Sequence, residues 1–457
     1  MSAKEGIKQF GEKAIAAMVK ELKQLNNGAM KGKPVVVPID PSKLTKFEKR
    51  AALDAVNLIK KKRNGDIKGR TCANGAKQRR YVKAGEITYS PTVSLVSILT
   101  TLAIDAYEGR DVAIVDVPGA YLHADMPQTE GKKVLLKLKG DFVDIMCSVN
   151  EEFTPHVVYE GKTKVLYMKV LRAIYGCLES AMLWYNLYVT TLKGMGFELN
   201  PYDLCVANKI INGKQCTIVW YVDDNKISHV DPAVVDTIIQ ELTKHFGELS
   251  ITRGKEHTFL GMNIKIRDDK KIEIDMIEQI KEAIEWLGEK LENSASSPAN
   301  KKLFTSDDDA QQLNDEKSEL FHSIVAKLLF ICQRARPDIE PTVAYLCTRV
   351  SKSNVEDWKK LRRLVSFLKG TINDKRIIGA SSLENMHTWI DAAYGVYNDM
   401  RSQTGGAISL GWGIIHEKST IQKLNTKSST ESEVVGFSDY LPHNIQMKNF
   451  YKVKVIV

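Results

Sequence analysis

The chain has 457 residues, of which 43% are apolar and 26% are charged, as in ordinary folded proteins of two to four domains. The longest uncharged stretch, residues 87–104, contains Pro91 and many Ser and Thr residues, which excludes a membrane span. The net charge of +9 includes basic clusters that suit a polyanionic partner, although each alone is more typical of a solvated face: 60–63, 77–80 and 359–363.

The seven cysteines are odd in number and widely spaced, and they form no zinc-binding pattern. They predict free thiols in a reducing compartment. The first 25 residues have the pattern of an amphipathic helix rather than of a signal peptide, so we expect a cytoplasmic protein that is not secreted.

The predicted elements of the first half alternate between helix and strand. A helix over 3–25 ends at Asn26-Asn27-Gly28, and residues 44–60 are helical or mixed. Asn64-Gly65, between basic segments, predicts a two-residue hairpin turn. Ser90-Pro91 opens a further helix. The elements that follow are a strand at 112–115, a helix carrying Trp184, a hairpin around Asp223 and a helix near 232–246.

The second half contains a hairpin around residues 259–261 and then the clearest linker, residues 293–316, which is rich in Ser, Asp, Asn and Lys. Three helices are expected after it, near 318–334, 338–350 and 355–370. From about residue 387 the pattern returns to strands, followed by a helix at 429–441 and a strand-like segment at 452–457.

Asp116 follows directly on the strand at 112–115, and Asp223 and Asp224 lie at the tip of the hairpin that begins with residues 217–222. Taken singly, an acidic residue that follows a strand more often caps the next turn. An Asp pair in a turn is more often simply exposed to solvent. If the two elements pair in one sheet, three carboxylates converge at one end of it. Such a group holds two divalent cations about 3.5–4 Å apart and suits phosphoryl transfer between a nucleic acid and a nucleoside triphosphate.

Several ordered motifs resemble one family. "TYSPTVSLVSILTTLAIDA", "DVAIVDVPGAYLHADMP", "VLRAIYGCLESAMLWY", "WYVDDNKISHV" and "HTFLGMNI" are similar to the reverse transcriptase of copia-type LTR retrotransposons. "LFHSIVAKLLFICQRARPDIEPTVAYLCTRVSKS" resembles the region that follows it in those polyproteins. "WIDAAYGVYNDMRSQTGGAIS" and "NTKSSTESEVVGFSDYLP" resemble the start of the adjoining ribonuclease H domain.

The resemblance implies an α+β fold of the right-hand polymerase type. Such a fold has fingers, a palm with an antiparallel sheet, and thumb or connection helices; here a truncated ribonuclease-H-like domain would follow. The implied ranges are 1–292 for fingers and palm with the primer-grip hairpin, 293–316 for the linker, 317–383 for the helical thumb or connection, and 384–457 for the ribonuclease-H-like domain.

By resemblance, Asp116 and Asp223 are the principal ligands of two Mg²⁺ ions, with Mn²⁺ as an alternative, and Asp224 is a weaker third ligand. The ions would orient a primer 3′-hydroxyl for in-line attack on the α-phosphate of a deoxynucleoside triphosphate. Arg70, helped by Lys68, is implied to grip the triphosphate, since a guanidinium offers a bidentate fork to phosphate. A solvated hairpin residue is the alternative for Arg70.

Tyr121 is implied to lie under the incoming sugar, where its ring leaves no room for a 2′-hydroxyl; a core tyrosine is the alternative. Leu178 and Glu179 stand where most copia relatives carry Lys and Gln. Glu cannot donate the hydrogen bonds of a Gln amide unless it is protonated, which puts nucleotide bracing in doubt. The hairpin that grips the primer terminus is matched by Phe259, Leu260 and Gly261.

The basic helix at 355–370 is implied to follow the phosphates of the product duplex, with a merely solvated face as the alternative. Asp391 and Glu433 match the first two of about four carboxylates that a ribonuclease H site needs around two metals. Glu431 would face elsewhere on the same helix. Residues 442–457 contain no Asp or Glu. We therefore expect a half-built, vestigial metal site and no ribonuclease H activity from this chain.

The first hypothesis is an RNA-directed DNA polymerase whose partners are an RNA template, a DNA primer or product duplex, and deoxynucleoside triphosphates. It would act in the cytoplasm, with virus-like particles as one setting, and have access to the nucleus. The alternative is a non-catalytic nucleic-acid-binding remnant of a decayed element. A generic two-metal nuclease or phosphatase explains the acids but not the fingers hairpin. The sequence indicates no membrane partner and no particular oligomeric state.

Overall fold

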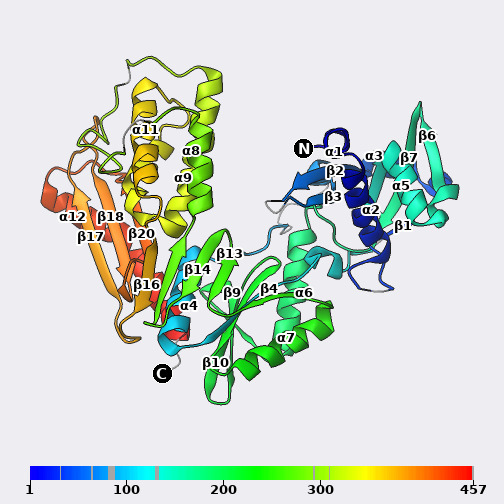
Figure 1. Ribbon diagram of the computed structural model, residues 1–457, viewed down its shortest axis with the longest axis horizontal. Helices are drawn as coiled ribbons and strands as arrows, with labels where there is room; N and C mark the ends of the chain where they lie inside the picture. The colour runs from blue at the N-terminus through cyan, green and yellow to red at the C-terminus, as the bar shows by residue number, and fades with distance from the viewer. Residues whose placement is uncertain are drawn as a thin grey trace.

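The computed structural model describes residues 1–30, 32–62, 65–80, 88–128, 133–291, 294–307 and 309–454. These residues form a mixed α+β structure with four β-sheets, which confirms the expected fold class (Figure 1). Figure 1 shows a blue and teal N-terminal lobe on the right, a green sheet region at the bottom, and yellow helices with orange strands at the upper left. None of the described helices is both long and apolar enough to cross a lipid bilayer.

The N-terminal lobe is built on a six-stranded sheet. Its strands are, in spatial order, β1 (Val36–Pro38), β7 (Thr163–Val170), β5 (Leu135–Lys139), β2 (Leu53–Lys61) and β3 (Ile67–Ala73), and β6 (Val157–Glu160) also pairs with β7. Strands β2 and β3 are antiparallel, from Ala55 opposite Ala73 to Lys61 opposite Ile67. The predicted hairpin is therefore confirmed, but its two-residue turn is wrong. The Lys62 N–H donates to the Asp66 carbonyl at 2.7 Å, which leaves three residues between this bonded pair, and 63 and 64 lie outside the described residues.

Four helices belong to this lobe: α1 (Ala3–Phe10), α2 (Glu12–Asn27), α3 (Lys46–Ala51) and α5 (Asp141–Val149). The single helix expected over 3–25 is two helices, because Gly11 adopts a φ of +55° and ends α1. Helix α2 buries residues at helical spacing in an apolar core that it shares with the sheet: Ala14, Met18, Leu22 and Leu25.

The second sheet carries the predicted carboxylates. Its six strands are, in order, β12 (Ser250–Arg253), β4 (Asp111–Asp116), β11 (Asp224–His229), β10 (Lys214–Tyr221), β9 (Asp203–Ile211) and β8 (Glu198–Asn200). Among the helices in the same apolar core are α4 (Leu95–Glu108), α6 (Ser180–Gly194) and α7 (Pro232–Phe246). The expected strand at 112–115 and the expected helices around Trp184 and 232–246 are confirmed.

Helix α4 begins later than the sequence suggests. The expected start at Ser90-Pro91 is wrong, since the helix begins at Leu95. The Ser94 hydroxyl accepts a hydrogen bond from the Ser97 N–H and caps the first turn.

A buried ion pair ties α4 to β11. The Lys226 ammonium donates to one oxygen of the Asp105 carboxylate, and the Ser228 hydroxyl donates to the other at 2.7 Å. The Arg110 guanidinium lies 3.8 Å from the same carboxylate. The side chains of Lys226 and Asp105 have no exposed area, so neither charge is solvated by bulk water and each depends on the other.

The third sheet joins segments that are far apart in the sequence. Its order is β13 (Glu256–Phe259), β14 (Met262–Ile266), β15 (Lys271–Asp275), β16 (Arg376–Ala380) and β19 (Gly411–Trp412). Between β15 and β16 in the chain come α8 (Ile277–Leu287), α9 (Asp315–Ala335), α10 (Glu340–Cys347) and α11 (Val355–Gly370), which include the helical group at the top of Figure 1. The three helices expected after the linker are confirmed, with shifted ends for the first two.

The C-terminal sheet contains β17 (His387–Ala393), β18 (Gln403–Ser409) and β20 (His416–Ile421), and α12 (Ser429–Lys454) packs on it. Helix α12 continues through Pro442, so the strand expected at 452–457 is wrong for 452–454, and 455–457 lie outside the described residues.

One arginine ties this sheet to the rest of the structure. The Arg376 guanidinium on β16 lies 2.8 Å from the Glu417 carboxylate on β20. It also donates to the Gln333 carbonyl on α9 at 2.9 Å. A single buried side chain therefore connects the third sheet, the helical group and the C-terminal sheet.

Replacing Lys226 with Ala should strongly destabilise the protein, because the Asp105 carboxylate would remain buried after losing its closest cation. Breaking a buried pair in this way costs about 3–5 kcal/mol. The measurement is urea unfolding followed by tryptophan fluorescence. The matched control is Lys255→Ala, since the pair of Lys255 with Asp268 is largely exposed and its loss should change stability far less. Equal losses in the two variants would contradict the expectation.

Candidate active site

The register of two strands brings the predicted acids together. Strands β4 and β11 are antiparallel neighbours in which Asp116 lies directly opposite Asp224. Side chains of directly opposite residues project from the same face of a sheet, so these two carboxylates share a face. The Val117 N–H donates to the Asp223 carbonyl at 3.0 Å and continues the pairing into the turn.

The turn that carries Asp223 is strained. It has two central residues between Tyr221, the last residue of β10, and Asp224, the first of β11. Val222 adopts a φ of +60°, which costs a β-branched residue on the order of 1–3 kcal/mol. The Trp184 indole on α6 donates to the Val222 carbonyl at 2.7 Å and helps to hold this conformation.

Hydrogen bonds behind the turn fix the start of β11. Asn225 is fully buried, and its amide donates to the carbonyls of Asp223 at 2.8 Å and of Val115 at 3.2 Å. The Tyr188 hydroxyl donates to the Asn225 side-chain oxygen at 2.5 Å. One asparagine therefore connects the turn, β4 and α6, and restrains the Asp pair relative to the end of β4.

The three acids repel one another. Burial and the neighbouring charges of Asp223 and Asp116 raise the pKa of Asp224 to about 6. Burial, and then the Asp223 charge, also raises the pKa of Asp116, while the nearby Lys68 and Arg70 oppose that rise. Ionised together, the carboxylates form a negative site that a divalent cation would neutralise.

The donor chemistry fits Mg²⁺, which prefers oxygen ligands. The geometry is looser than a finished cage: within the described residues no three Asp, Glu, His or Cys side chains stand in a metal-binding arrangement. Asp116 and Asp224 form the cross-strand pair, and Asp223 in the turn interacts with both through its charge. These are the residues that would hold the ions.

The two predicted triphosphate-binding cations lie on β3, within electrostatic reach of Asp116. The Arg70 guanidinium stacks on the Tyr175 ring, 4.2 Å from its centroid. The Tyr175 ring lies 4.8 Å from that of Tyr121. Burial and the nearby Arg70 lower the pKa of Lys68, and the Asp116 charge opposes this. The structure therefore brings Lys68, Arg70 and Tyr121 to the same site as the carboxylates.

Tyr175 is a site residue that the sequence analysis did not single out. It lies in "AIYGCLES", three residues before Leu178, and joins Arg70 to Tyr121. Glu179 is the N-cap of α6, and its side chain makes no capping hydrogen bond there. The Leu178 N–H donates to the Gln78 side chain at 2.9 Å, which connects this segment to the basic cluster at 77–80.

The predicted primer hairpin lies against the helical group. Phe259 is buried in the core, whereas Leu260 and Gly261 form the turn, with φ values of +49° and +83°. A Cβ at Gly261 would lie 3.2 Å from the Phe330 ring on α9, so the glycine permits a close approach. The Arg334 guanidinium stacks on the same ring, 3.8 Å from its centroid.

The region that contains these elements matches a known family. Residues 44–300 match the family model described as reverse transcriptase (RNA-dependent DNA polymerase). The chain belongs to this family. The resemblance to the reverse transcriptases of copia-type retrotransposons is thereby confirmed, since the relatives with similar sequences are transposon polyproteins.

Three of these relatives come from a plant and a yeast. The retrovirus-related Pol polyprotein from transposon TNT 1-94 of Nicotiana tabacum is 25% identical over 86% of this chain and 29% of its own length. The putative transposon Ty5-1 protein of Saccharomyces cerevisiae is 25% identical over 71% of this chain and 98% of its own length. The Ty1-LR2 Gag-Pol polyprotein of the same yeast is 24% identical over 87% of this chain and 22% of its own length. The chain thus spans under a third of the two polyproteins.

A solved structure supports the polymerase fold. The foamy viral protease-reverse transcriptase, solved in complex with double-stranded DNA, is similar with a TM-score of 0.51 over 90% of this chain and 58% of that chain. Its sequence identity is 15%, so the likeness concerns the fold alone.

The basic residues of helix α11, which lies beyond the family match, are bonded within the chain. Lys359 pairs with Glu356 at 2.6 Å, and Arg362 pairs with Glu289 at 2.5 Å. Lys360 donates to the Thr305 carbonyl, and Arg363 donates to the Ser297 hydroxyl. All four cations have intramolecular partners, which favours a structural role and leaves duplex binding by this helix a prediction.

The two predicted ribonuclease H acids lie on packed elements but are both exposed. Along β17 exposure alternates, and Asp391 shares the open face with the exposed Trp389. Helix α12 packs on the other face, where the Asn444 amide donates to the Thr388 hydroxyl. Glu433 lies on the first turns of α12. The packing contacts between the two elements are therefore made by residues other than this pair.

Replacing Asp224 with Asn should raise the Tm of metal-free protein at pH 8. The folded-state pKa of about 6 lies above the ordinary value of 3.8, so ionisation of Asp224 costs stability as the pH rises through this interval. The difference in Tm between Asp224→Asn and the unmodified protein should shrink as the pH is lowered towards 5, where the native carboxyl is itself protonated. Thermal denaturation followed by circular dichroism, with EDTA present, measures the Tm of each protein at each pH.

Mg²⁺ supplies the second arm of this test. It should raise the Tm of the unmodified protein more than that of Asp224→Asn, because the ion relieves repulsion that the variant has already reduced. Asp268→Asn, at an exposed position, is the control and should show neither effect. A Tm gain in Asp224→Asn that is independent of pH would contradict the proposed repulsion.

Proposed function

We propose that the chain is an RNA-directed DNA polymerase that extends a DNA primer on an RNA template with deoxynucleoside triphosphates. The observation that carries this proposal is the pairing of Asp116 with Asp224 beside Asp223, within electrostatic reach of the cations of β3. The family match and the transposon relatives support it. A generic two-metal nuclease would not require Lys68 and Arg70 at the same carboxylates.

Each residue has a role in this proposal. Two Mg²⁺ ions, or Mn²⁺, when bound by the acids would activate the primer 3′-hydroxyl and neutralise charge on the leaving pyrophosphate. Lys68 and Arg70 bind the triphosphate, and the Tyr175 ring holds the guanidinium plane by stacking. Tyr121 occupies the space that a 2′-hydroxyl would need. These contacts orient the α-phosphate for in-line attack, which is most of what a polymerase must do.

The primer terminus is assigned to the hairpin turn at Leu260 and Gly261. The Gly261 carbonyl accepts a hydrogen bond from the Gln279 amide at 2.8 Å, so α8 holds the turn, and Phe330 on α9 lies against it. The Phe259 side chain supports this turn from the core, because it is 1% exposed and cannot itself contact nucleic acid. Glu179 is assigned to the nucleotide-bracing segment at the start of α6.

The runner-up is a nucleic-acid-binding remnant without turnover. One observation favours it: Glu179 stands in place of a Gln amide. We also propose that this chain alone has no ribonuclease H activity, because Asp391 projects from the face of β17 that α12 does not cover. A reducing compartment such as the cytoplasm suits the seven free cysteines, and particle enclosure and nuclear access belong to the same proposal.

Primer extension separates the two functions. With poly(rA), an oligo(dT) primer, dTTP and Mg²⁺, the unmodified protein should incorporate nucleotide, and Asp223→Asn should reduce the rate by about 10²–10³-fold or more. The binding of primer–template should remain within a few-fold of the unmodified protein. Binding of primer–template by the unmodified protein without incorporation would instead support the remnant.

Sugar selection tests the role of Tyr121. Replacing it with Ala should lower the preference for dTTP over UTP by about 10–100-fold, because the space for a 2′-hydroxyl opens. The ratio of kcat/KM for the two nucleotides measures this preference. Tyr185→Ala, at another partly buried tyrosine, on α6, is the control and should leave the ratio unchanged. An unchanged ratio in Tyr121→Ala would assign that ring to the core.

A further inference from the structure

Helix α2 lies outside the region that matches the family model, yet it packs directly on the strand that carries Lys68 and Arg70. Between those two cations stands Gly69, which is buried. A Cβ at Gly69 would lie 2.7 Å from the Ala17 carbonyl oxygen and 3.0 Å from the Met18 sulfur. The strand therefore needs a glycine there to accept the helix, and the helix sets the position of both cations.

One carboxylate of α2 holds the same strand through its backbone. The Thr71 N–H donates to Glu21 at 2.9 Å, and the Thr71 hydroxyl donates to the Asn57 side chain on β2 at 2.8 Å. Thr71 is 2% exposed, so these hydrogen bonds are shielded from water. Burial raises the pKa of Glu21, and its bond to Thr71 and the charges of Arg70 and Lys68 oppose that rise.

The next turn of α2 reaches the other side of the site. Gly119, in the turn after Asp116, has a φ of +64°, and a Cβ there would lie 2.9 Å from the Gln24 amide nitrogen. A small cavity of about 40 Å³ lies between these elements, and its walls include Glu21, Gln24, Arg70, Gly119 and Tyr175. One helix thus contacts both the cationic strand and the chain segment that leaves the carboxylates.

We propose that Glu21 and Gln24 are positioning residues for the triphosphate: through α2 they fix the separation between the cations of β3 and the carboxylates of β4. This inference rests on the polymerase function proposed above and extends it to a helix that the family match does not include. Neither side chain would touch the reacting atoms. Their loss would displace Lys68 and Arg70 from the phosphates, so binding of the nucleotide should suffer more than binding of nucleic acid.

The test compares a variant that loses the hydrogen bond to Thr71 with one that keeps an acceptor for it. The readout is the Kd of dTTP in the complex of protein, poly(rA) and a dideoxy-terminated oligo(dT) primer with Mg²⁺, which requires no turnover. Glu21→Ala should raise this Kd about tenfold, as expected for loss of a buried hydrogen bond to a charged group. Glu21→Gln should stay within about threefold, because a Gln oxygen still accepts the Thr71 N–H. Gln24→Ala should shift the Kd in the same direction as Glu21→Ala.

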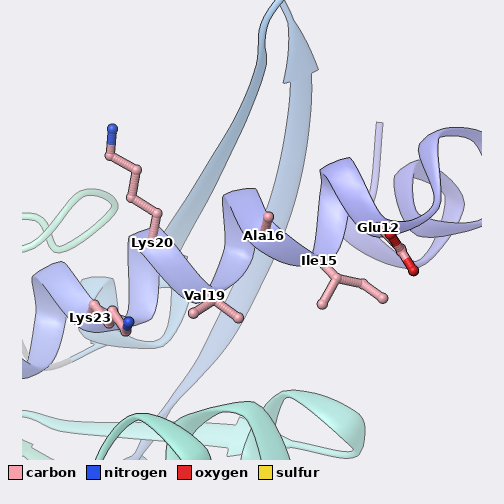
Figure 2. A pocket seen from close by; sticks show the side chains of 6 residues that line it. All are labelled: Glu12, Ile15, Ala16, Val19, Lys20 and Lys23. Carbon is pink, nitrogen blue, oxygen red and sulfur yellow. The ribbon is translucent and has the colours of Figure 1, made fainter.

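An exposed part of α2 supplies the control. Figure 2 shows Glu12, Lys20 and Lys23 with Ile15, Ala16 and Val19 around a hollow that these side chains line. Glu12→Ala removes an exposed acid of the same helix and should leave the dTTP Kd unchanged. In steady-state primer extension the same pattern should appear as a rise in KM for dTTP with a smaller change in kcat.

Three outcomes would overturn the inference. They are an unchanged dTTP Kd in Glu21→Ala, an equal loss of primer–template affinity in that variant, or an equal effect from Glu12→Ala. If Glu21→Ala does not fold, Gln24→Ala carries the comparison, and normal dTTP affinity in it overturns the proposal. Failure of the polymerase function is seen separately, as an unmodified protein that binds dTTP and primer–template but incorporates nothing.

Discussion

The structure depends on the antiparallel register of β4 with β11. In this register Asp116 lies opposite Asp224, and the turn that holds Asp223 closes beside them. A slip of one residue would move every side chain of β11 to the other face and separate the acids. Two buried groups prevent such a slip: Lys226, which is paired with Asp105 on α4, and Asn225, which is bonded to the Val115 carbonyl. The register of the site is therefore secured by polar groups that never meet solvent.

The site keeps its conformation although its own carboxylates repel one another. Three carboxylates repel one another, and Val222 occupies a conformation that a β-branched residue seldom adopts. Such features persist because the surrounding core is extensive and the Trp184 indole bonds the strained turn. Arg70 and Lys68 supply the opposite charge from a separate sheet. An anionic substrate carrying its own cation would complete the balance, as the proposed function requires.

Local patterns are enough to predict elements, whereas contacts across the chain are not. The predicted bounds of helix α11 match the structure, in which Asn354 begins the helix with a capping box and the apolar residues keep helical spacing. It does not predict the break at Gly11, since the apolar spacing continues across it. The convergence of Asp116 with Asp224 depends on the family resemblance, as no local pattern specifies strand order. Glu21 and Tyr175 escape sequence reasoning, because their partners lie far away in the sequence; Tyr175 lies in a family motif, but the motif does not reveal its contact with Arg70.

The pairing of β15 with β16 has a consequence for how the protein is made. During synthesis, β15 leaves the ribosome before helices α8 to α11 and before β16, the strand that pairs with its edge. Strand β19 follows later still. During that interval the growing chain exposes an unsatisfied row of backbone groups at β15, which is where a chaperone or a wrong neighbouring strand would attach. This sheet can therefore be completed only after the intervening helices have been synthesised.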